Sequence, residues 1–350
     1  MQHTQTPQER EQQLSQWVAR QLSHAPENIR LLPIASDAGF RRYFRFTTPS
    51  QWLAVDAPPQ TEDTLQFVNL ARYLHENEVN TPEIRAVDET VGFLLVTDFG
   101  DELLYHSLTT GNFKEGYRQT FNTLLSLQAC PEKPSLIPIY DRTLLRRELD
   151  IFIEWFVGKL LGYALDGTEQ LMLDALFTNL EANALEQPQT LVHRDFHSRN
   201  LLVCADQRLG VIDFQGALWG GCTYDLVSLL KDCYLRWPAD QIRELALEYH
   251  RTSLKAGLVS ADVDEKTYLR WFDWMGLQRH IKVLGIFARL HLRDGKPHYL
   301  KDLPLVIRYS LEVTQAYPEL KPFADWFCAK LLPHVEQQSW YSDYRLAGEQ

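Results

Sequence analysis

The chain has 350 residues, a formal net charge of −11, and 45% hydrophobic and 23% charged residues. One hydrophobic core rarely organises this length, so we expect two domains, and the ordinary composition argues against disordered, fibrous and repeat architectures. The acidic balance disfavours nucleic acid as a partner, because phosphate-backbone binding depends on clustered Lys and Arg side chains.

The N-terminal part begins with a helix signal and continues with strand patterns. Thr6-Pro7-Gln8-Glu9 combines a capping-box Thr and Glu with Pro at the first helical position, so a helix opens the chain. Leu31 to Ala57 predicts a β-hairpin, with Ser36-Asp37-Ala38-Gly39 as turn residues and Trp52 to Val55 as a third strand. Thr61 to Glu78 has helical spacing of its apolar residues.

The pattern changes from strands to helices near residue 98. Glu83 to Ala86 and Phe93 to Val96 predict two further strands, and Leu191 to Gln215 is a β-rich island in a helical remainder. We therefore expect an α+β fold with a β-rich lobe of residues 1–98 and a larger, mainly helical lobe of residues 99–350. Helices are expected at Leu144 to Leu161, Glu169 to Leu185, Tyr224 to Leu235, Ala239 to Ala256 and Lys266 to Leu292.

The sequence has no feature that directs it to a membrane or the secretory route. Met1 to Gln16 is polar and lacks the profile of a signal peptide, and no apolar run approaches the length of a membrane span. We expect a cytoplasmic protein without a membrane or nucleic-acid partner, and no protein partner is evident.

The strongest chemical signal is His193-Arg194-Asp195-Phe196-His197-Ser198-Arg199-Asn200, the H-R-D-x-x-x-x-N pattern of a kinase catalytic loop. With this spacing, a loop can point the Asp195 carboxylate at a substrate hydroxyl while Asn200 turns its amide oxygen toward a metal ion. Asp213 follows an apolar strand 18 residues after Asp195, where the kinase template has the carboxylate that binds Mg²⁺. Mg²⁺ prefers hard oxygen ligands, so Asn200, Asp213 and the phosphates of ATP would suffice.

Each of these residues also has an ordinary structural interpretation. Asp195 or Asp213 alone would be a turn or cap residue, and Asn200 alone would be a turn residue. His193 and His197 are four residues apart, but the segment is predicted as a loop, which disfavours a zinc pair. We expect His193 to brace the loop and His197 to lie near substrate or at a polar surface.

With these motifs, the chain resembles the aminoglycoside phosphotransferase superfamily, in which H-x-D-x-x-x-x-N is followed by an acidic strand end and by G-x-x-x-D, here Gly221 to Asp225. The resemblance implies the two-lobed protein-kinase-like fold, ATP and Mg²⁺ as cofactors, and a small-molecule substrate. It also implies that Asp225 supports the catalytic loop, although Asp225 could instead cap the following helix.

A narrower resemblance is to the bacterial anomeric N-acetylmuramate/N-acetylglucosamine kinases of cell-wall recycling. It is carried by Ser36 to Ala38, Arg41 to Arg45, Asp56 to Pro59, Leu145 to Leu149 and Gly276 to His280. It implies phosphorylation of the C1 hydroxyl of an N-acetylated sugar to a sugar 1-phosphate. Kinases of other small alcohols, such as an aminoglycoside, homoserine or choline, are the alternative, and a catalytically silent nucleotide-binding protein is the alternative from another class.

The chain departs from the kinase pattern because no Lys precedes Lys114, so the third strand cannot supply the usual phosphate-binding Lys. Arg41, Arg42 or Arg45 could replace it, and Arg45 is the expected contact, although a solvated strand-face arginine is the ordinary interpretation. The resemblance places adenine beside the backbone of Thr97, Asp98 and Phe99.

Sugar contacts are expected in the helical lobe beside Asp195. Glu148 has an alternative as a helix-surface carboxylate, and Trp219 and Tyr224 have one as core residues. Arg279 and His280 could reach an anionic group of the substrate or be helix-surface charges. The candidates for hydroxyl bonding or ring stacking are Glu148, His197, Gln215, Trp219 and Tyr224.

Overall fold

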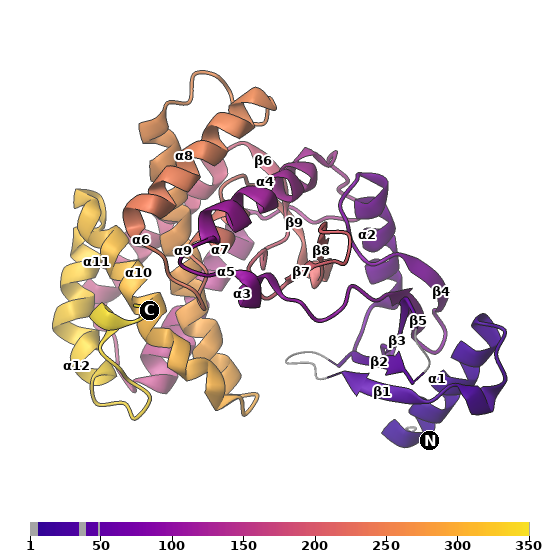
Figure 1. The fold of residues 1–350 in the computed structure, drawn as a ribbon. Coiled ribbons are helices and arrows are strands. Elements are labelled where there is room, and N and C mark those ends of the chain that lie inside the picture. The colour runs from indigo at the N-terminus through magenta and orange to yellow at the C-terminus, as the bar shows by residue number, and fades with distance from the viewer. Residues whose placement is uncertain (1–5, 35–39, 48–49, 350) are drawn as a thin grey trace. The chain divides into compact units, whose positions relative to one another are not determined.

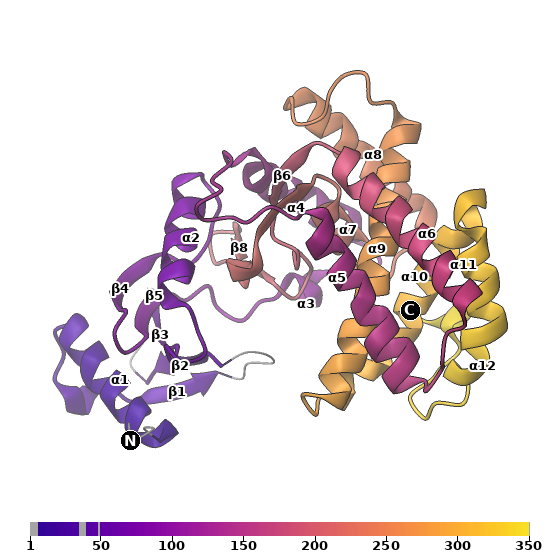
Figure 2. The ribbon, with the colours of Figure 1, turned by 180° about the vertical axis from the view of Figure 1, so that it is seen from behind.

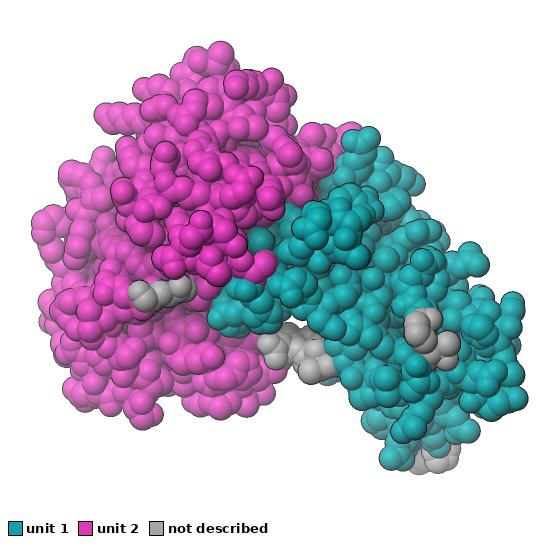
Figure 3. Space-filling view, viewed as in Figure 1, with its two compact units in different colours: residues 1–106, 199–215 teal, residues 107–198, 216–350 magenta. Residues whose placement is uncertain are grey.

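The computed structural model describes residues 6–34, 40–47 and 50–349. The predicted turn Ser36-Asp37-Ala38-Gly39 lies outside the described residues. The chain forms two compact units (Figure 3): unit 1 contains residues 1–106 and 199–215, and unit 2 contains residues 107–198 and 216–350.

Unit 1 is built on an antiparallel five-stranded sheet with the order β1-β2-β3-β5-β4 (Figure 1). Side chains alternate between its faces, so Phe44 and Phe46 of β2 face α1 while Tyr43 and Arg45 point to the other face. The strands are β1 (Leu31–Ile34), β2 (Arg42–Phe46), β3 (Trp52–Asp56), β4 (Ile84–Asp88) and β5 (Phe93–Thr97).

Two helices accompany this sheet. Helix α1 (Pro7–Gln21) begins with the predicted capping box, in which Thr6 and Glu9 bond each other's backbone N–H groups. Its buried face, with Leu14 and Trp17, packs on the sheet. Helix α2 (Thr64–Glu76) is capped by Asp63, whose side chain accepts from the Gln66 N–H at 2.9 Å.

A hairpin from much later in the sequence completes unit 1. Strands β7 (Leu201–Val203) and β8 (Leu209–Val211) pair antiparallel. The Val203 N–H donates to the Glu102 carbonyl at 2.7 Å and the Val211 N–H to the Asn80 carbonyl at 2.8 Å. The first segment of unit 1 extends to residue 106 rather than 98, and residues 199–215 join it through these backbone bonds.

Unit 2 is mainly helical, with one two-stranded sheet of β6 (Gln189–Val192) and β9 (Leu218–Gly221). Helices α5 and α6 both pack against the long helix α9 (Figure 2). The helices are α4 (Phe113–Ala129), α5 (Arg142–Ile151), a π-helix (Phe152–Leu160), α6 (Gly167–Glu186), α7 (Tyr224–Leu230), α8 (Ala239–Lys255), α9 (Glu265–Leu292), α10 (Leu303–Ala316), α11 (Lys321–Trp326), a second π-helix (Phe327–Leu331) and α12 (Leu332–Val335), with α3 (Leu104–Ser107) at the passage from unit 1.

Helix α9 is the centre of the hydrophobic core of unit 2 and is buried on most of its circumference. At Gly285 the packing is closest, because a Cβ there would lie 2.6 Å from the backbone of Ile151 and Phe152. The missing side chain therefore lets the end of α5 and the start of the π-helix reach the α9 backbone.

The predicted elements are mostly present. Helix α7 ends at Leu230 rather than Leu235, since the Asp232 carboxylate accepts the N–H groups of Ser198 and Tyr234 and draws the chain out of the helix. Strand β9 was not predicted, because Gly220 and Gly221 give a weak strand signal. Among the described residues, no helix is both long and apolar enough to cross a membrane.

Candidate active site

The loop after β6 is held by Asp225, a fully buried residue in the first turn of α7. Its carboxylate accepts the backbone N–H of His193 at 2.6 Å and that of Arg194 at 3.0 Å. Arg194 has a φ of 78°, a left-handed conformation that non-glycine residues rarely adopt. The two hydrogen bonds fix this turn, so the Asp195 side chain projects from an anchored backbone.

Asp195 is exposed to solvent, and positive charges surround it. Desolvation by the neighbouring protein would raise the pKa of its carboxyl, but Lys282, His197, Arg279 and Arg194 outweigh that effect and lower the pKa to about 2. Asp195 is therefore an accessible carboxylate that stays ionised at neutral pH.

Two of these cations, Arg194 and Lys282, belong to a polar network centred on Glu148 of α5, which is 5% exposed. Its carboxylate is ion-paired with Arg194 and with Lys282, the latter at 3.1 Å, and accepts the hydroxyl of Tyr140. Lys282 also donates to the Tyr224 hydroxyl at 3.1 Å. Burial raises the pKa of Glu148, but Lys282 and Arg194 reverse this effect, so its pKa lies below the usual value.

Glu148 and Tyr224, predicted as sugar contacts, thus lie in the network that pairs with Arg194 of the loop after β6. His197 packs edge-on against Tyr234 with 5.5 Å between ring centroids. Trp219 is half-buried on β9 and pairs with Leu191 of β6. The unit 2 candidates therefore lie on α5, on α7, on β9 and in the loop after β6.

Asn200 and Asp213 lie at one end of the β7–β8 hairpin in unit 1. The register pairs Leu201 with Val211, and the Ile212 N–H donates to the Asn200 carbonyl at 3.1 Å. Asp213 has a φ of 62°, and the Gln215 side-chain amide donates to its carboxylate.

The donor set at this hairpin end, one amide oxygen and one exposed carboxylate, fits Mg²⁺, which keeps several waters and nucleotide oxygens in its shell. The described residues contain no group of three or more His, Cys, Asp or Glu side chains arranged to hold a metal ion. Two protein ligands would leave the remaining positions around such an ion to water and nucleotide oxygens.

The other nucleotide candidates in unit 1 are at the end of β5. The Arg45 guanidinium is ion-paired with Asp98 and with Asp101. The Thr97 N–H donates to the Glu83 carbonyl and the Asp98 N–H to the Gln51 carbonyl. Two of the three N–H groups predicted to lie beside adenine therefore already have backbone acceptors.

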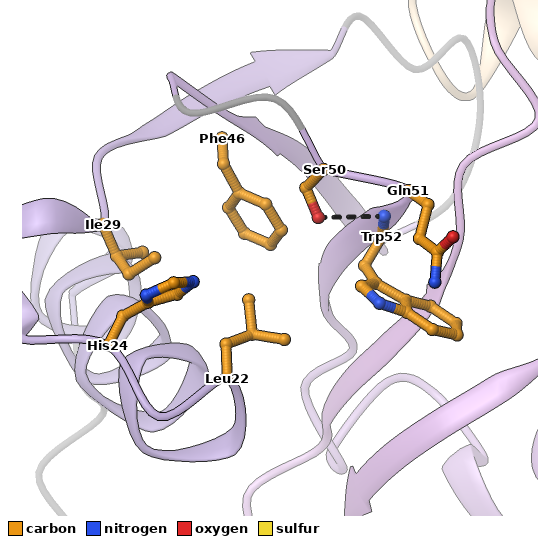
Figure 4. Close-up of a pocket in the computed structure, with 7 residues that line it drawn as sticks. All are labelled: Leu22, His24, Ile29, Phe46, Ser50, Gln51 and Trp52. Atoms are coloured by element: carbon orange, nitrogen blue, oxygen red, sulfur yellow. Dashed lines mark hydrogen bonds between the residues drawn. The ribbon is translucent and has the colours of Figure 1, made fainter.

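A cavity of about 370 Å³ in unit 1 lies among α1, β2 and β3 (Figure 4). Its seven lining residues include Ile29, Phe46 and Trp52, and none is a predicted site residue. Phe46 belongs to the sheet face that packs on α1, opposite the face of Tyr43 and Arg45, so this cavity is separate from the candidate site.

Lys282 and Arg279 were not predicted as neighbours of Asp195, although Arg279 was considered as a contact for a substrate anion. Arg279 is 3% exposed and donates to the Cys233 sulfur at 3.3 Å. The sequence signal that could have found them is the presence of Arg279 and Lys282 within a largely apolar helix. A Lys or Arg buried in such a helix normally needs an acidic or polar partner.

Comparison with known proteins identifies the family whose motifs this chain carries. Residues 30–262 match the model of a family described as the phosphotransferase enzyme family. N-acetylmuramate/N-acetylglucosamine kinase from Pseudomonas aeruginosa is 40% identical over 291 residues, which are 83% of this chain and 85% of that protein. The protein of the same name from Neisseria meningitidis is 35% identical, covering 90% of this chain and 94% of its own.

Solved structures with the same fold have low sequence identity. Aminoglycoside phosphotransferase APH(2'')-Ib with ADP bound is 16% identical, with a TM-score of 0.57, and the match covers 86% of this chain and 98% of that one. An ethanolamine kinase from Plasmodium vivax is 10% identical, with a TM-score of 0.59 and 85% of both chains covered. These likenesses confirm the expected kinase-like fold.

Proposed function

Because this chain belongs to the phosphotransferase enzyme family, we propose that it is an ATP-dependent kinase of an amino sugar. The substrate class follows from its relatives, which are N-acetylmuramate/N-acetylglucosamine kinases and align over most of the chain. The acceptor is the C1 hydroxyl of the sugar, and the products are a sugar 1-phosphate and ADP. The reaction uses ATP, so we place it in the cytoplasm.

Asp195 acts on the attacking hydroxyl. The sugar oxygen forms a bond to the γ-phosphorus of ATP, the bond from that phosphorus to the ADP oxygen breaks, and the hydroxyl proton passes to the Asp195 carboxylate. A carboxylate with a pKa of about 2 is a weak base. Its main contribution is therefore to orient the hydroxyl, and it accepts the proton as the new bond forms.

Asn200 and Asp213 would hold Mg²⁺ through one amide and one carboxylate oxygen, with Gln215 restricting the Asp213 carboxylate by its hydrogen bond. When bound, the ion offsets the negative charge of the phosphates during transfer. Asp225 and His193 position the loop that carries Asp195, and Phe99 and its neighbours are the proposed adenine contacts.

The observation that carries the proposal is Asp195, an ionised and accessible carboxylate on a backbone anchored by Asp225. The same surroundings favour a neutral or anionic sugar over a polycationic aminoglycoside. Glu148 and Asp225 are buried and already accept internal donors, whereas Arg279 and Lys282 add positive charge beside Asp195.

The proposal is tested by ADP release from the purified protein with Mg²⁺-ATP and one acceptor at a time: N-acetylmuramate, N-acetylglucosamine, glucose, kanamycin, homoserine or choline. We expect turnover of an N-acetylated sugar, its loss with the methyl glycoside that blocks C1, and a decrease of about 10²–10⁴-fold in kcat for Asp195→Asn. Turnover of choline, homoserine or kanamycin alone would reject the amino-sugar assignment. Absence of turnover with every acceptor would reject the kinase.

A further inference from the structure

Unit 1 lacks the lysine that binds nucleotide phosphates in kinases, where a third-strand Lys pairs with a Glu of the following helix. The first lysine of the chain is Lys114. On β3, the residue opposite Tyr43 is Val55, so an apolar side chain lies on the sheet face that points away from α1. A cation for this role must come from another strand.

Arg41, directly before β2, lies on the same side as Tyr43 and is 8% exposed. Its Nε is ion-paired with the Glu62 carboxylate at 2.9 Å, two residues before α2 begins. Its guanidinium carbon lies 4.4 Å from the centroid of the Phe67 ring of α2. A cation on the sheet therefore pairs with a Glu beside the next helix, the arrangement that the Lys–Glu pair provides in kinases.

Arg41 is also close to the proposed metal ligand Asp213. Phe67, beneath the guanidinium, stacks on Phe214 with 5.0 Å between ring centroids, and Phe214 directly follows Asp213. Tyr43 interacts electrostatically with both Arg41 and Asp213. Arg41 is therefore joined to the metal-binding end of the β7–β8 hairpin through two aromatic contacts within one compact unit.

The two neighbouring arginines on β2 are more strongly ion-paired within the protein than Arg41. Arg42 points to the opposite face and shares the fully buried Asp56 carboxylate with Arg10. Arg45 is paired with two carboxylates, Asp98 and Asp101. A phosphate would have to displace two anions from Arg45, whereas Arg41 pairs with one anion, Glu62, through Nε and otherwise with the uncharged Tyr43 hydroxyl.

We propose that Arg41, braced by Glu62, binds the phosphates of ATP in place of the missing third-strand lysine. This inference rests on the proposed kinase function. Arg41 supplies a planar, permanently charged donor that can meet two phosphate oxygens at once. Glu62 fixes its orientation and offsets its charge when no nucleotide is bound.

The test is calorimetric binding of ATP, ADP, AMP and adenosine to the wild-type protein and to Arg41→Ala, Arg45→Ala and Arg85→Ala. Arg85 is exposed on β4 and serves as the matched control for loss of one positive charge in unit 1. We expect R41A to weaken ATP and ADP binding by roughly 10- to 100-fold while adenosine binding changes little. R85A should retain the wild-type preference for ATP over adenosine.

A purely structural role of Arg41 would weaken all four ligands together, and that outcome overturns the inference. An ATP-to-adenosine preference that is lost in R45A and kept in R41A also overturns it. If R41A is unfolded at the assay temperature, Arg41→Lys is judged by the same ratio, with a smaller loss expected because Lys keeps the charge but not the planar donor pair. Failure of the wild-type protein to prefer ATP over adenosine would instead reject the kinase proposal.

Discussion

Removing the charge of Glu148 should destabilise unit 2 strongly. Glu148 is 5% exposed and neutralises Arg194 and Lys282 while accepting the Tyr140 hydroxyl. In Glu148→Gln the side chain keeps its size, but the buried Lys282 and the partly buried Arg194 both lose their carboxylate partner. The change therefore leaves two positive charges in a site that offers little solvent.

Breaking a buried ion pair from one side typically costs about 3–5 kcal/mol, because the remaining charge stays buried. At about 2–4 °C per kcal/mol for a unit of this size, the melting temperature should fall by roughly 10 °C. Glu154→Gln is the matched control, since Glu154 lies in the adjoining π-helix and pairs with Lys159 at a site where its side chain is 57% exposed. Such an exposed pair contributes at most about 1 kcal/mol.

The assay is thermal unfolding of the purified variants, read by circular dichroism and accompanied by sugar KM values. Adding Lys282→Met to E148Q should restore part of the lost stability, because one of the two unpaired cations is then absent. A melting temperature for E148Q within about 1 °C of wild type, together with a raised sugar KM, would refute this reasoning and make Glu148 a sugar contact.

Three further perturbations test other parts of the molecule. Burial raises the Asp225 pKa to about 6, above its value in the unfolded chain. The free energy of unfolding of the wild type relative to Asp225→Asn should therefore fall by up to about 3 kcal/mol as the pH rises from 4 to 7. A pH-independent difference between the two proteins in urea unfolding would contradict this. Asp213→Asn should raise the Mg²⁺ concentration for half-maximal ADP release by roughly tenfold or more, since one hard anionic ligand is lost, and an unchanged Mg²⁺ requirement would exclude Asp213 from the metal site. Gly285→Ala should lower the free energy of unfolding by about 1–3 kcal/mol, because its Cβ would lie 2.6 Å from backbone atoms. Gly276→Ala on the same helix is the control: its Cβ has its nearest contact at 3.5 Å, so the change should be neutral or stabilising. Equal melting temperatures of the two variants would show that the helices separate easily at Gly285.

The sequence predicted the elements whose patterns are local. The capping box of Thr6 and Glu9 began the first helix, and alternating or helical spacing located the strands of unit 1 and the helix that contains Lys282. The spacing between Asp195 and Asn200 predicts a catalytic loop from consecutive residues alone, and that role stays a prediction.

Features that depend on tertiary contacts were less accessible. Lys282 approaches Glu148 from a helix more than a hundred residues later in the chain, and no sequence period records such a pairing. Arg41 and Arg45 point to the same side of the sheet, and the partners and burial that distinguish them depend on tertiary contacts. The association of residues 199–215 with unit 1 likewise rests on backbone hydrogen bonds between distant segments.

Because unit 1 consists of two separate segments of the chain, it cannot be exchanged with the corresponding unit of a relative as one continuous piece. A fragment ending at residue 106 would lack the β7–β8 hairpin and leave the backbone partners offered by Asn80 and Glu102 unused. A hybrid made with a single crossover would join a foreign hairpin to a native sheet. Exchange of the whole of unit 1 between two relatives therefore calls for three junctions, near residues 106, 198 and 215.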